Sequence, residues 1–420
     1  MENKNDVLLK VEHLCQYFKM GRQKLKAVDD VSFEIKKGEV FGLVGESGCG
    51  KTTTGRSIIK LYDITGGDVY FKGRRVCAGN LTYNKAIAKK KAEARKAINE
   101  QIAIYANDKS KLDEVYAEIE RIKADRNEVV SKQRALKSVA IHDHKHGDKI
   151  YAGELLKKLE EDYAKKLESV KDDPEAYKAM RKKYRHDRNV AKHSRFITQI
   201  QMIFQDPIAS LDPRMTVREI ISEGLVIKGI KDKEYIDNKV YEILETVGLV
   251  REHADRYPHE FSGGQRQRIG IARAVVMEPE MIIADEPVSA LDVSIQAQVI
   301  NLLNDLREKL GLTILFIAHD LSVVKYFSDR IGVMYFGKMV ELASSDELFA
   351  HPLHPYTKSL LSAIPLPDPN YEKGRVRITY NPIAEHDYSV NKPSLREVAP
   401  NHFVYCNDEE EAKYKAQLGC

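Results

Sequence analysis

The chain has 420 residues, 43% of them hydrophobic and 31% charged, and its 67 Lys and Arg nearly balance its 63 Asp and Glu, leaving a formal charge of +4. This length predicts two or three domains with packed cores. No stretch approaches the ~20 apolar residues that cross a bilayer, and the start lacks the apolar run of a signal peptide, so we expect a cytosolic chain. The five cysteines are scattered, which argues against a disulfide framework.

Residues 1–79 are predicted to form the first part of an α/β domain. Short β-like runs (VSFEI, EVFGLVG and GDVYFKG) surround one helical stretch that follows Lys51. Strands that alternate with helices indicate a largely parallel sheet covered by helices.

The segment GESGCGKT, residues 45–52, matches G-x-x-x-x-G-K-[ST] between an apolar strand and a helix. Its glycines let backbone N–H groups point inward around a β-phosphate, and the Lys51 ammonium can reach the β- and γ-phosphates. Thr52 offers a hydroxyl to Mg²⁺. Cys49 is interpreted as a small filler rather than a redox sensor. The predicted phosphate-binding residues are Gly45, Glu46, Ser47, Gly48, Cys49, Gly50, Lys51, Thr52 and Thr53.

Residues 80–195 differ in composition and periodicity and are predicted to be an inserted helical hairpin or small bundle. Residues 81–200 hold 29 Lys and Arg against 20 Asp and Glu, so this block carries the basic excess of the chain. Apolar residues recur three or four apart, the helical period, and NDKSK and HDHKHGDK are predicted breaks between helices. A solvated helical surface without chemistry is the favoured interpretation.

Residues 196–345 are predicted to complete the α/β domain. The run MIIADE ends with two adjacent carboxylates at the end of an apolar strand. Asp285 is suited to hold Mg²⁺ through water beside the phosphate loop. Glu286 is suited to orient and polarise an attacking water.

A second glycine motif precedes that strand. In FSGGQRQR, Ser262 is a predicted N-cap, and Gly263, Gly264 and Gln265 open a helix. A helix start of this kind is another anion-binding terminus. Residues 346–420 are expected to form a C-terminal extension, which is Pro-rich and irregular from 351 to 400.

In order and spacing, these motifs resemble the nucleotide-binding subunit of ATP-binding cassette (ABC) transporters, over about 1–77 and 198–345 with further similarity to ~365. The resemblance implies an α/β P-loop NTPase fold, with a mixed sheet and a helical subdomain. It implies that the SGGQ motif of one subunit closes over ATP held by the phosphate loop of another. Lys51, Glu286 and His319 would be catalytic, with His319 as a switch that contacts the γ-phosphate.

The resemblance implies further roles for residues outside the two glycine motifs. Gln205 would sense the γ-phosphate and Mg²⁺, and would act in catalysis. Asp292, in SALD, would lie in the loop that crosses the dimer interface. Phe18, or its neighbour Tyr17, would stack on adenine.

The phrases GESGCGKTT, FQDPIASLDPRMTV and HPLHPYTKSLLSAIPLPDP are similar to the oligopeptide and dipeptide importer group, and most of all to its second, F-type ATPase subunit. This implies ATP hydrolysis with Mg²⁺, coupled to peptide import at the cytoplasmic face of the membrane, where the chain would be peripheral. Implied partners are a D-type ATPase subunit, two membrane permease subunits and, indirectly, an extracellular peptide-binding protein. Nickel importers share these features, so the cargo follows from analogy.

The sequence departs from the importer pattern in two places. Close relatives carry a cysteine cluster after the HPY segment, whereas this tail offers only Cys406 and Cys420, so four-cysteine ligation within it is not supported. Relatives are also expected to join the strand near Val76 to the segment before Gln205 by a short link. His351 and His354 are interpreted as part of a packed or interface segment rather than as metal ligands.

A rival hypothesis is a soluble ABC ATPase that acts on nucleic acid or chromosomes, because the basic insertion could bind phosphate backbones. The insertion ends before Gln205, whereas chromosome ATPases place their coiled coil after it, and this chain has one cassette. We therefore expect no nucleic-acid partner. The role of the insertion stays open between anionic lipid headgroups, the partner ATPase and surface decoration.

Overall fold

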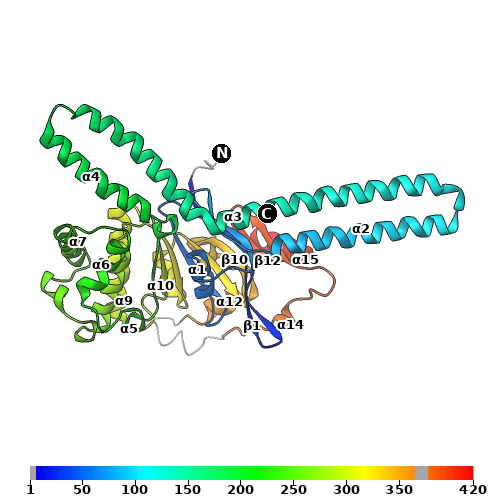
Figure 1. Cartoon of the computed structure of the whole chain (residues 1–420). Coiled ribbons are helices and arrows are strands. Elements are labelled where there is room, and N and C mark those ends of the chain that lie inside the picture. Colours follow the sequence, from blue (N-terminus) through cyan, green and yellow to red (C-terminus); the bar gives the residue numbers. More distant parts are fainter. Residues whose placement is uncertain (1–5, 365–376, 420) are drawn as a thin grey trace.

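The computed structural model describes residues 6–364 and 377–419. A core of two sheets and packed helices carries two long helical arms that project from it (Figure 1). Among the described residues, no helix combines the length and apolar composition that a membrane span requires.

The N-terminal region builds an antiparallel sheet with the strand order β2-β1-β4-β5. Its strands are β1 (Val7–Met20), β2 (Gln23–Lys36), β4 (Gly66–Phe71) and β5 (Arg74–Ala78). Along β1, Leu9 and Val11 are buried while Lys10 and Glu12 are more exposed, the alternation of a sheet with one face in the core.

The main sheet has eight strands in the order β11-β12-β10-β9-β3-β8-β7-β6. Its parallel part consists of β6 (Ile200–Ile203), β7 (Met281–Asp285), β8 (Thr313–Ala318), β3 (Val40–Val44) and β9 (Arg330–Tyr335). Every residue of β3, β7 and β8 is buried, as expected for strands covered on both faces.

The two faces of this sheet contribute to different cores. Val40 and Val44 of β3 belong to a core shared with the helices that follow β6, whereas Phe41 and Leu43 belong to a core shared with the antiparallel sheet. The helices that pack around the sheet are α1 (Lys51–Ile58), α9 (Val293–Leu310) and α10 (Leu321–Phe327). The predicted α/β fold with a mixed sheet is confirmed.

A helical subdomain connects β6 to β7. Its helices are α5 (Pro207–Ser210), α6 (Val217–Ile227), α7 (Lys233–Thr246) and α8 (Gly263–Val275). Short 3-10 turns stand at η4 (Arg251–Asp255) and η5 (Pro258–Glu260), and η3 (Phe196–Gln199) precedes β6. Buried aliphatic residues such as Ile221, Val240 and Leu244 join these helices to the core under the main sheet.

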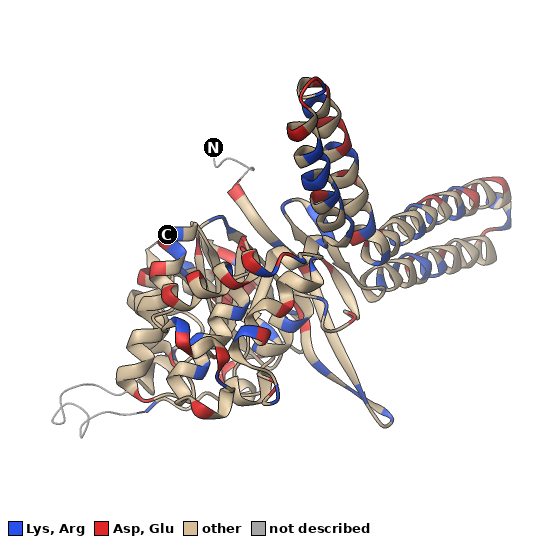
Figure 2. Cartoon of the chain, turned by 60° about the vertical axis from the view of Figure 1, so that its left-hand side comes forward, with Lys and Arg blue, Asp and Glu red and all other residues tan. Residues whose placement is uncertain are grey.

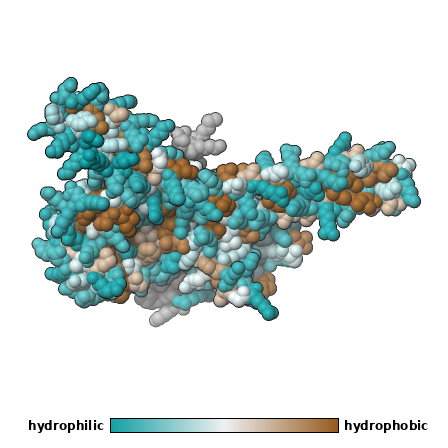
Figure 3. Space-filling model, viewed as in Figure 1, coloured by the Kyte–Doolittle hydropathy of each residue, from teal (hydrophilic) through white to brown (hydrophobic). Residues whose placement is uncertain are grey.

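The inserted segment forms two helical hairpins that share one helix. The helices are α2 (Leu81–Asn107), α3 (Leu112–Ser169) and α4 (Pro174–His193), with η2 (Lys109–Lys111) at the first turn. The α2–α3 arm and the α3–α4 arm diverge from the middle of α3, and acidic and basic residues interleave along both (Figures 1 and 2). Hydrophilic residues cover most of the visible surface of the arms (Figure 3).

The predicted break at NDKSK is confirmed, but the predicted break at HDHKHGDK is wrong, because α3 runs through residues 142–149 without interruption. This polar stretch is where α3 meets the core. Asp143 accepts a hydrogen bond from Arg75 at 2.9 Å, and the Lys60 ammonium donates to the His144 carbonyl at 2.8 Å. Asp148 accepts from the Phe196 amide at 2.9 Å. Asp143 and Asp148 are thus bonded by groups of the core, and the helix continues through this stretch.

The C-terminal extension is more regular than its prolines indicate, which corrects the expectation of an irregular segment. After β10 (Lys338–Ser344), it contains α11 (Ser345–Ala350), α12 (Pro355–Ser362), α14 (Pro382–Glu385), β11 (Ser394–Ala399), β12 (His402–Cys406) and α15 (Asp408–Leu418). β12 pairs with β10, so the extension adds two strands to the main sheet.

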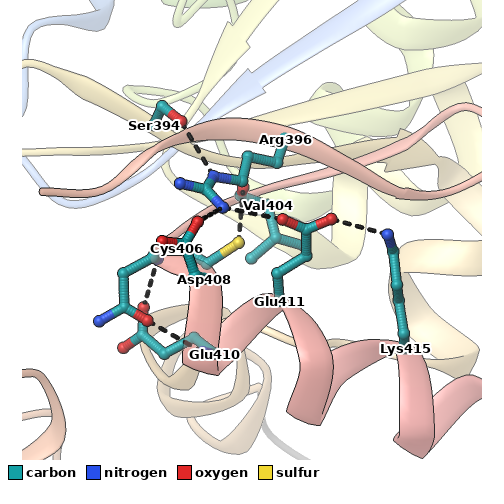
Figure 4. A network of polar contacts seen from close by, with 9 residues as sticks. Ser394, Arg396, Val404, Cys406, Asp408, Glu410, Glu411 and Lys415 are labelled. Carbon is teal, nitrogen blue, oxygen red and sulfur yellow. Dashed lines mark hydrogen bonds and ion pairs between the residues drawn. The ribbon is translucent and has the colours of Figure 1, made fainter. Parts of the chain in front are cut away.

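An ion-pair network ties α15 to this added hairpin (Figure 4). Arg396 of β11 bonds both Asp408 and Glu411 of α15, and Lys415 pairs with Glu411 at 2.7 Å. Cys406, buried nearby, donates to the Val404 carbonyl. Among the described residues no group of His, Cys, Asp and Glu is arranged to hold a metal. Cys420 and residues 365–369 of the HPY phrase lie outside the described residues.

Candidate active site

The phosphate loop turns tightly between β3 and α1. Gly45 has φ 148° and Gly50 has φ 107°, backbone conformations that L side chains rarely adopt. A Cβ atom would also lie 2.2 Å from the Met334 carbonyl oxygen at Gly45 and 2.3 Å from the Ala27 carbonyl oxygen at Gly50. Only glycine fits either position, and the loop packs directly on the neighbouring backbone.

Lys51 lies at the start of α1 and is 4% exposed. Its ammonium donates to the carbonyl oxygens of Gly45 at 2.7 Å and Glu46 at 3.0 Å. The lysine side chain therefore folds back on its own loop and bridges two of the loop's carbonyl groups. Glu46, Ser47 and Gly48 form the exposed outer part of the loop.

Thr52 and Asp285 form an oxygen-rich pair below the loop. The Thr52 hydroxyl donates to Asp285 Oδ1 at 2.6 Å. Asp285 Oδ2 is buried without a hydrogen-bond partner, and Arg56 lies 3.9 Å away. Burial raises the pKa of this carboxyl group. A buried oxygen that lacks a donor, beside a hydroxyl, fits Mg²⁺, which prefers oxygen ligands.

Gln205, Glu286 and His319 converge from three strand ends. The Gln205 amide donates to Glu286 Oε2 at 3.1 Å, and His319 Nδ1 lies 3.1 Å from the same oxygen. Their strands, β6, β7 and β8, are parallel neighbours, so their carboxyl ends meet at one sheet edge, which the phosphate loop after β3 also shares. The three predicted residues are thus brought together.

The backbone of Glu286 has a positive φ of 44°, unusual for a residue with a side chain. Its amide donates to the Ile317 carbonyl at 2.9 Å, and the Ser289 hydroxyl donates to the Glu286 carbonyl at 3.1 Å. These contacts fix the turn that aims the Glu286 carboxylate at Gln205 and His319.

The SGGQ motif opens α8 in the helical subdomain. Ser262 is the N-cap and exchanges reciprocal hydrogen bonds with Gln265. A Cβ atom at Gly264 would lie 2.7 Å from the Ile295 side chain, and one at Gly263 would lie 3.6 Å from Leu291. The motif therefore packs beside the start of α9, whose N-cap is the exposed Asp292.

The two candidate adenine-stacking residues are adjacent on β1 and therefore point to opposite faces. The Tyr17 hydroxyl donates to Asp29, and Lys26 stands 5.6 Å from the Tyr17 ring. The Phe18 ring meets Tyr62 edge-on at 5.3 Å. The choice between Tyr17 and Phe18 stays a prediction.

Sequence reasoning missed two contacts to this site. Arg56 approaches Asp285 from α1, and Tyr356 of α12 accepts a hydrogen bond from the Glu46 amide at 3.0 Å. The HPY phrase signalled a packed segment, and His354 is indeed buried and caps α12. His351 is exposed and lies 3.3 Å from Glu347. No sequence pattern pointed from this phrase to the phosphate loop.

Comparison with known proteins places these features in a family. The ABC transporter family matches residues 28–155 and 155–289, and the family described as the oligopeptide/dipeptide transporter C-terminal region matches residues 340–390. The oligopeptide transport ATP-binding protein OppF of Bacillus subtilis is 48% identical, covering 97% of this chain and 98% of its own length. The dipeptide transport ATP-binding protein DppF of Lactococcus lactis is 40% identical, covering 97% and 96%.

Among solved structures, the dimeric ATP-binding cassette MJ0796 bound to ADP and Pi covers 80% of this chain, with 21% identity and a TM-score of 0.49. The alignments with the two curated relatives span nearly the whole chain and therefore include residues 80–195. The expected short link in relatives is thus wrong for these two. The chain belongs to the ABC transporter family and is one of its ATP-hydrolysing subunits.

Proposed function

We propose that this chain powers the import of oligopeptides or dipeptides across the cytoplasmic membrane. The convergence of Thr52, Asp285, Gln205, Glu286 and His319 beside the phosphate loop carries the hydrolytic part of the proposal. The peptide cargo is supported by the printed functions of the relatives and by the match at residues 340–390.

The residues of the site divide the work of phosphoryl transfer. Loop N–H groups and Lys51 bind the β- and γ-phosphates, while Glu286 polarises the attacking water and Gln205 and His319 orient it. Thr52, Asp285 and Gln205 would hold Mg²⁺. When bound, the ion neutralises charge that develops on the phosphate oxygens. Positioning and charge stabilisation supply most of this catalysis.

A complete site needs a second subunit. The helix terminus at Ser262–Gln265 is exposed or half-exposed and is capped only by its own residues, so it is available to an ATP molecule held by an opposing phosphate loop. We infer a D-type ATPase as that partner. Closure of the pair over two nucleotides would move two membrane permease subunits, with this chain peripheral at the cytoplasmic face.

Glu286→Gln tests the assigned base. The variant keeps the size and the hydrogen-bonding capacity of the side chain but loses its charge, so ATP should bind and the closed dimer should accumulate. We expect ATP turnover to fall about 10²–10⁴-fold. The matched control is Glu278→Gln, which removes only a surface ion pair with Lys239 and should keep wild-type turnover. Equal turnover in wild type and Glu286→Gln would refute the assignment.

Peptide uptake in cells lacking the native gene tests the cargo. Wild-type chain should restore uptake of a labelled tripeptide, and Glu286→Gln should not. If the wild-type chain restores nickel uptake but no peptide uptake, the cargo proposal fails while the ATPase assignment stands.

A further inference from the structure

A side chain of the C-terminal extension forms a hydrogen bond with the phosphate loop. The Glu46 amide donates to the phenolic oxygen of Tyr356 at 3.0 Å, across 310 residues of sequence. Tyr356 is 1% exposed, although Glu46 itself lies on the exposed outer part of the loop. A buried hydroxyl thus holds the backbone of an exposed turn.

The same residue is also held through its carbonyl group. The Glu46 carbonyl accepts from the Lys51 ammonium at 3.0 Å and from the Cys49 amide at 3.2 Å. Glu46 therefore links Tyr356 to the lysine that contacts the phosphates. A displacement of the Tyr356 hydroxyl would be transmitted to Lys51 through a single residue, Glu46.

Tyr356 is itself held rigidly. Its ring lies 4.4 Å from the ring of Tyr335, at the end of β9, and 5.6 Å from that of Tyr380. His354 caps the helix that carries it, and the His354 amide donates to the buried Glu341 of β10 at 3.0 Å. The hydroxyl is therefore fixed relative to the main sheet, on which the phosphate loop also stands.

We propose that Tyr356 is a positioning residue for ATP binding. It orders the Gly45–Glu46 turn of the phosphate loop and, through Glu46, the Lys51 ammonium. A loop that is ordered before the nucleotide arrives loses less conformational entropy on binding, so the bond strengthens ATP binding. Tyr356 acts through Glu46. The proposal rests on the ATPase activity alone and is independent of the cargo.

Tyr356→Phe in the full-length chain tests this role, because it removes the hydroxyl and keeps the ring. Loss of a hydrogen bond of ordinary net strength should raise the KM for MgATP about 2- to 10-fold and leave kcat within about twofold of the wild-type value. The control is Tyr414→Phe, which alters another buried tyrosine, in α15 of the same extension. A purely structural role would lower the unfolding temperature or the active fraction and leave the KM unchanged.

Two measurements distinguish the bond from a general loosening of the extension. Hydrogen exchange of the peptide that covers residues 45–50 should speed up in Tyr356→Phe and not in Tyr414→Phe. In a Glu46→Pro background, which lacks the donor N–H, Tyr356→Phe should leave the KM unchanged. An unaltered KM together with unaltered exchange in folded Tyr356→Phe would overturn the proposal.

Discussion

At the residue scale, the site depends on two adjacent carboxylates with different surroundings. Asp285 is fully buried on a strand and lacks a donor for one oxygen, whereas Glu286 stands on a strained turn and meets Gln205 and His319. The first environment suits a cation and the second suits a water molecule. One strand end thus supplies both functions, because the backbone turns at Glu286 and gives the two neighbouring carboxylates different surroundings.

Asp285→Asn should raise the stability of the nucleotide-free chain and lower its ATPase activity. Burial raises the native pKa of Asp285 above 3.8, so the stability that this group contributes declines as the pH rises through that native pKa. At neutral pH the neutral isostere should therefore raise the unfolding temperature of the nucleotide-free chain, while Mg²⁺-dependent ATPase activity falls at least about 100-fold. Calorimetry without nucleotide checks the first part, and a lower unfolding temperature than wild type would contradict it.

Much of this site could be predicted from the sequence, because phosphate-loop, strand-end and helix-cap residues act through local backbone geometry. The neighbouring residues alone were enough to predict the phosphate-loop turn at Gly45 and Lys51 and the helix N-cap at Ser262. Tyr356 could not be found in this way, since its partner Glu46 is 310 residues away. Contacts between distant segments leave no periodicity in a single sequence.

At the element scale, two predictions made from local sequence patterns were wrong for the same reason. The polar stretch HDHKHGDK resembles a loop, yet it stays helical because Asp143 and Asp148 find partners in Arg75 and the Phe196 amide. The Pro-rich tail resembles irregular chain, yet β12 finds an open edge at β10. In both cases, groups elsewhere in the fold bond the polar or backbone groups of the segment, which the local sequence alone would place in contact with solvent.

Gly147→Ala tests the continuity of α3. A Cβ atom there would lie 3.8 Å from the Arg75 carbonyl oxygen, an ordinary contact. Alanine favours a helix interior over glycine by about 1 kcal/mol, so the variant should be more stable by up to that amount in chemical denaturation. Gly153→Ala, with nothing within 4 Å, should behave alike. Destabilisation by both variants would show that α3 is interrupted.

At the scale of the whole molecule, we expect the core to hydrolyse ATP without the outer part of the α2–α3 arm. Lys90 of α2 pairs with Asp125 of α3 at 2.6 Å, which marks a point where the outer arm can be cut. Replacing residues 91–124 by a short glycine–serine turn should leave kcat and the KM for ATP unchanged, because the candidate catalytic residues lie at the start of α1 and just after β6, β7 and β8. Peptide uptake measured beside ATPase activity then shows whether the tip serves transport. A raised KM would contradict this separation.

The shared helix of the two arms has a mechanical consequence. α3 has 58 residues and is fastened to the core near its middle, at Asp143 and Asp148. At 1.5 Å per residue, its N-terminal portion extends about 45 Å beyond that attachment and its C-terminal portion about 30 Å. If the N-terminal portion of α3 pivoted about this attachment, a tilt of about 5° would displace its far end by about 4 Å. A force on one arm would thereby reach the other through the attachment at Arg75 and Phe196, which lies before the amino end of β6 and not at the carboxyl ends of the strands that carry Gln205, Glu286 and His319.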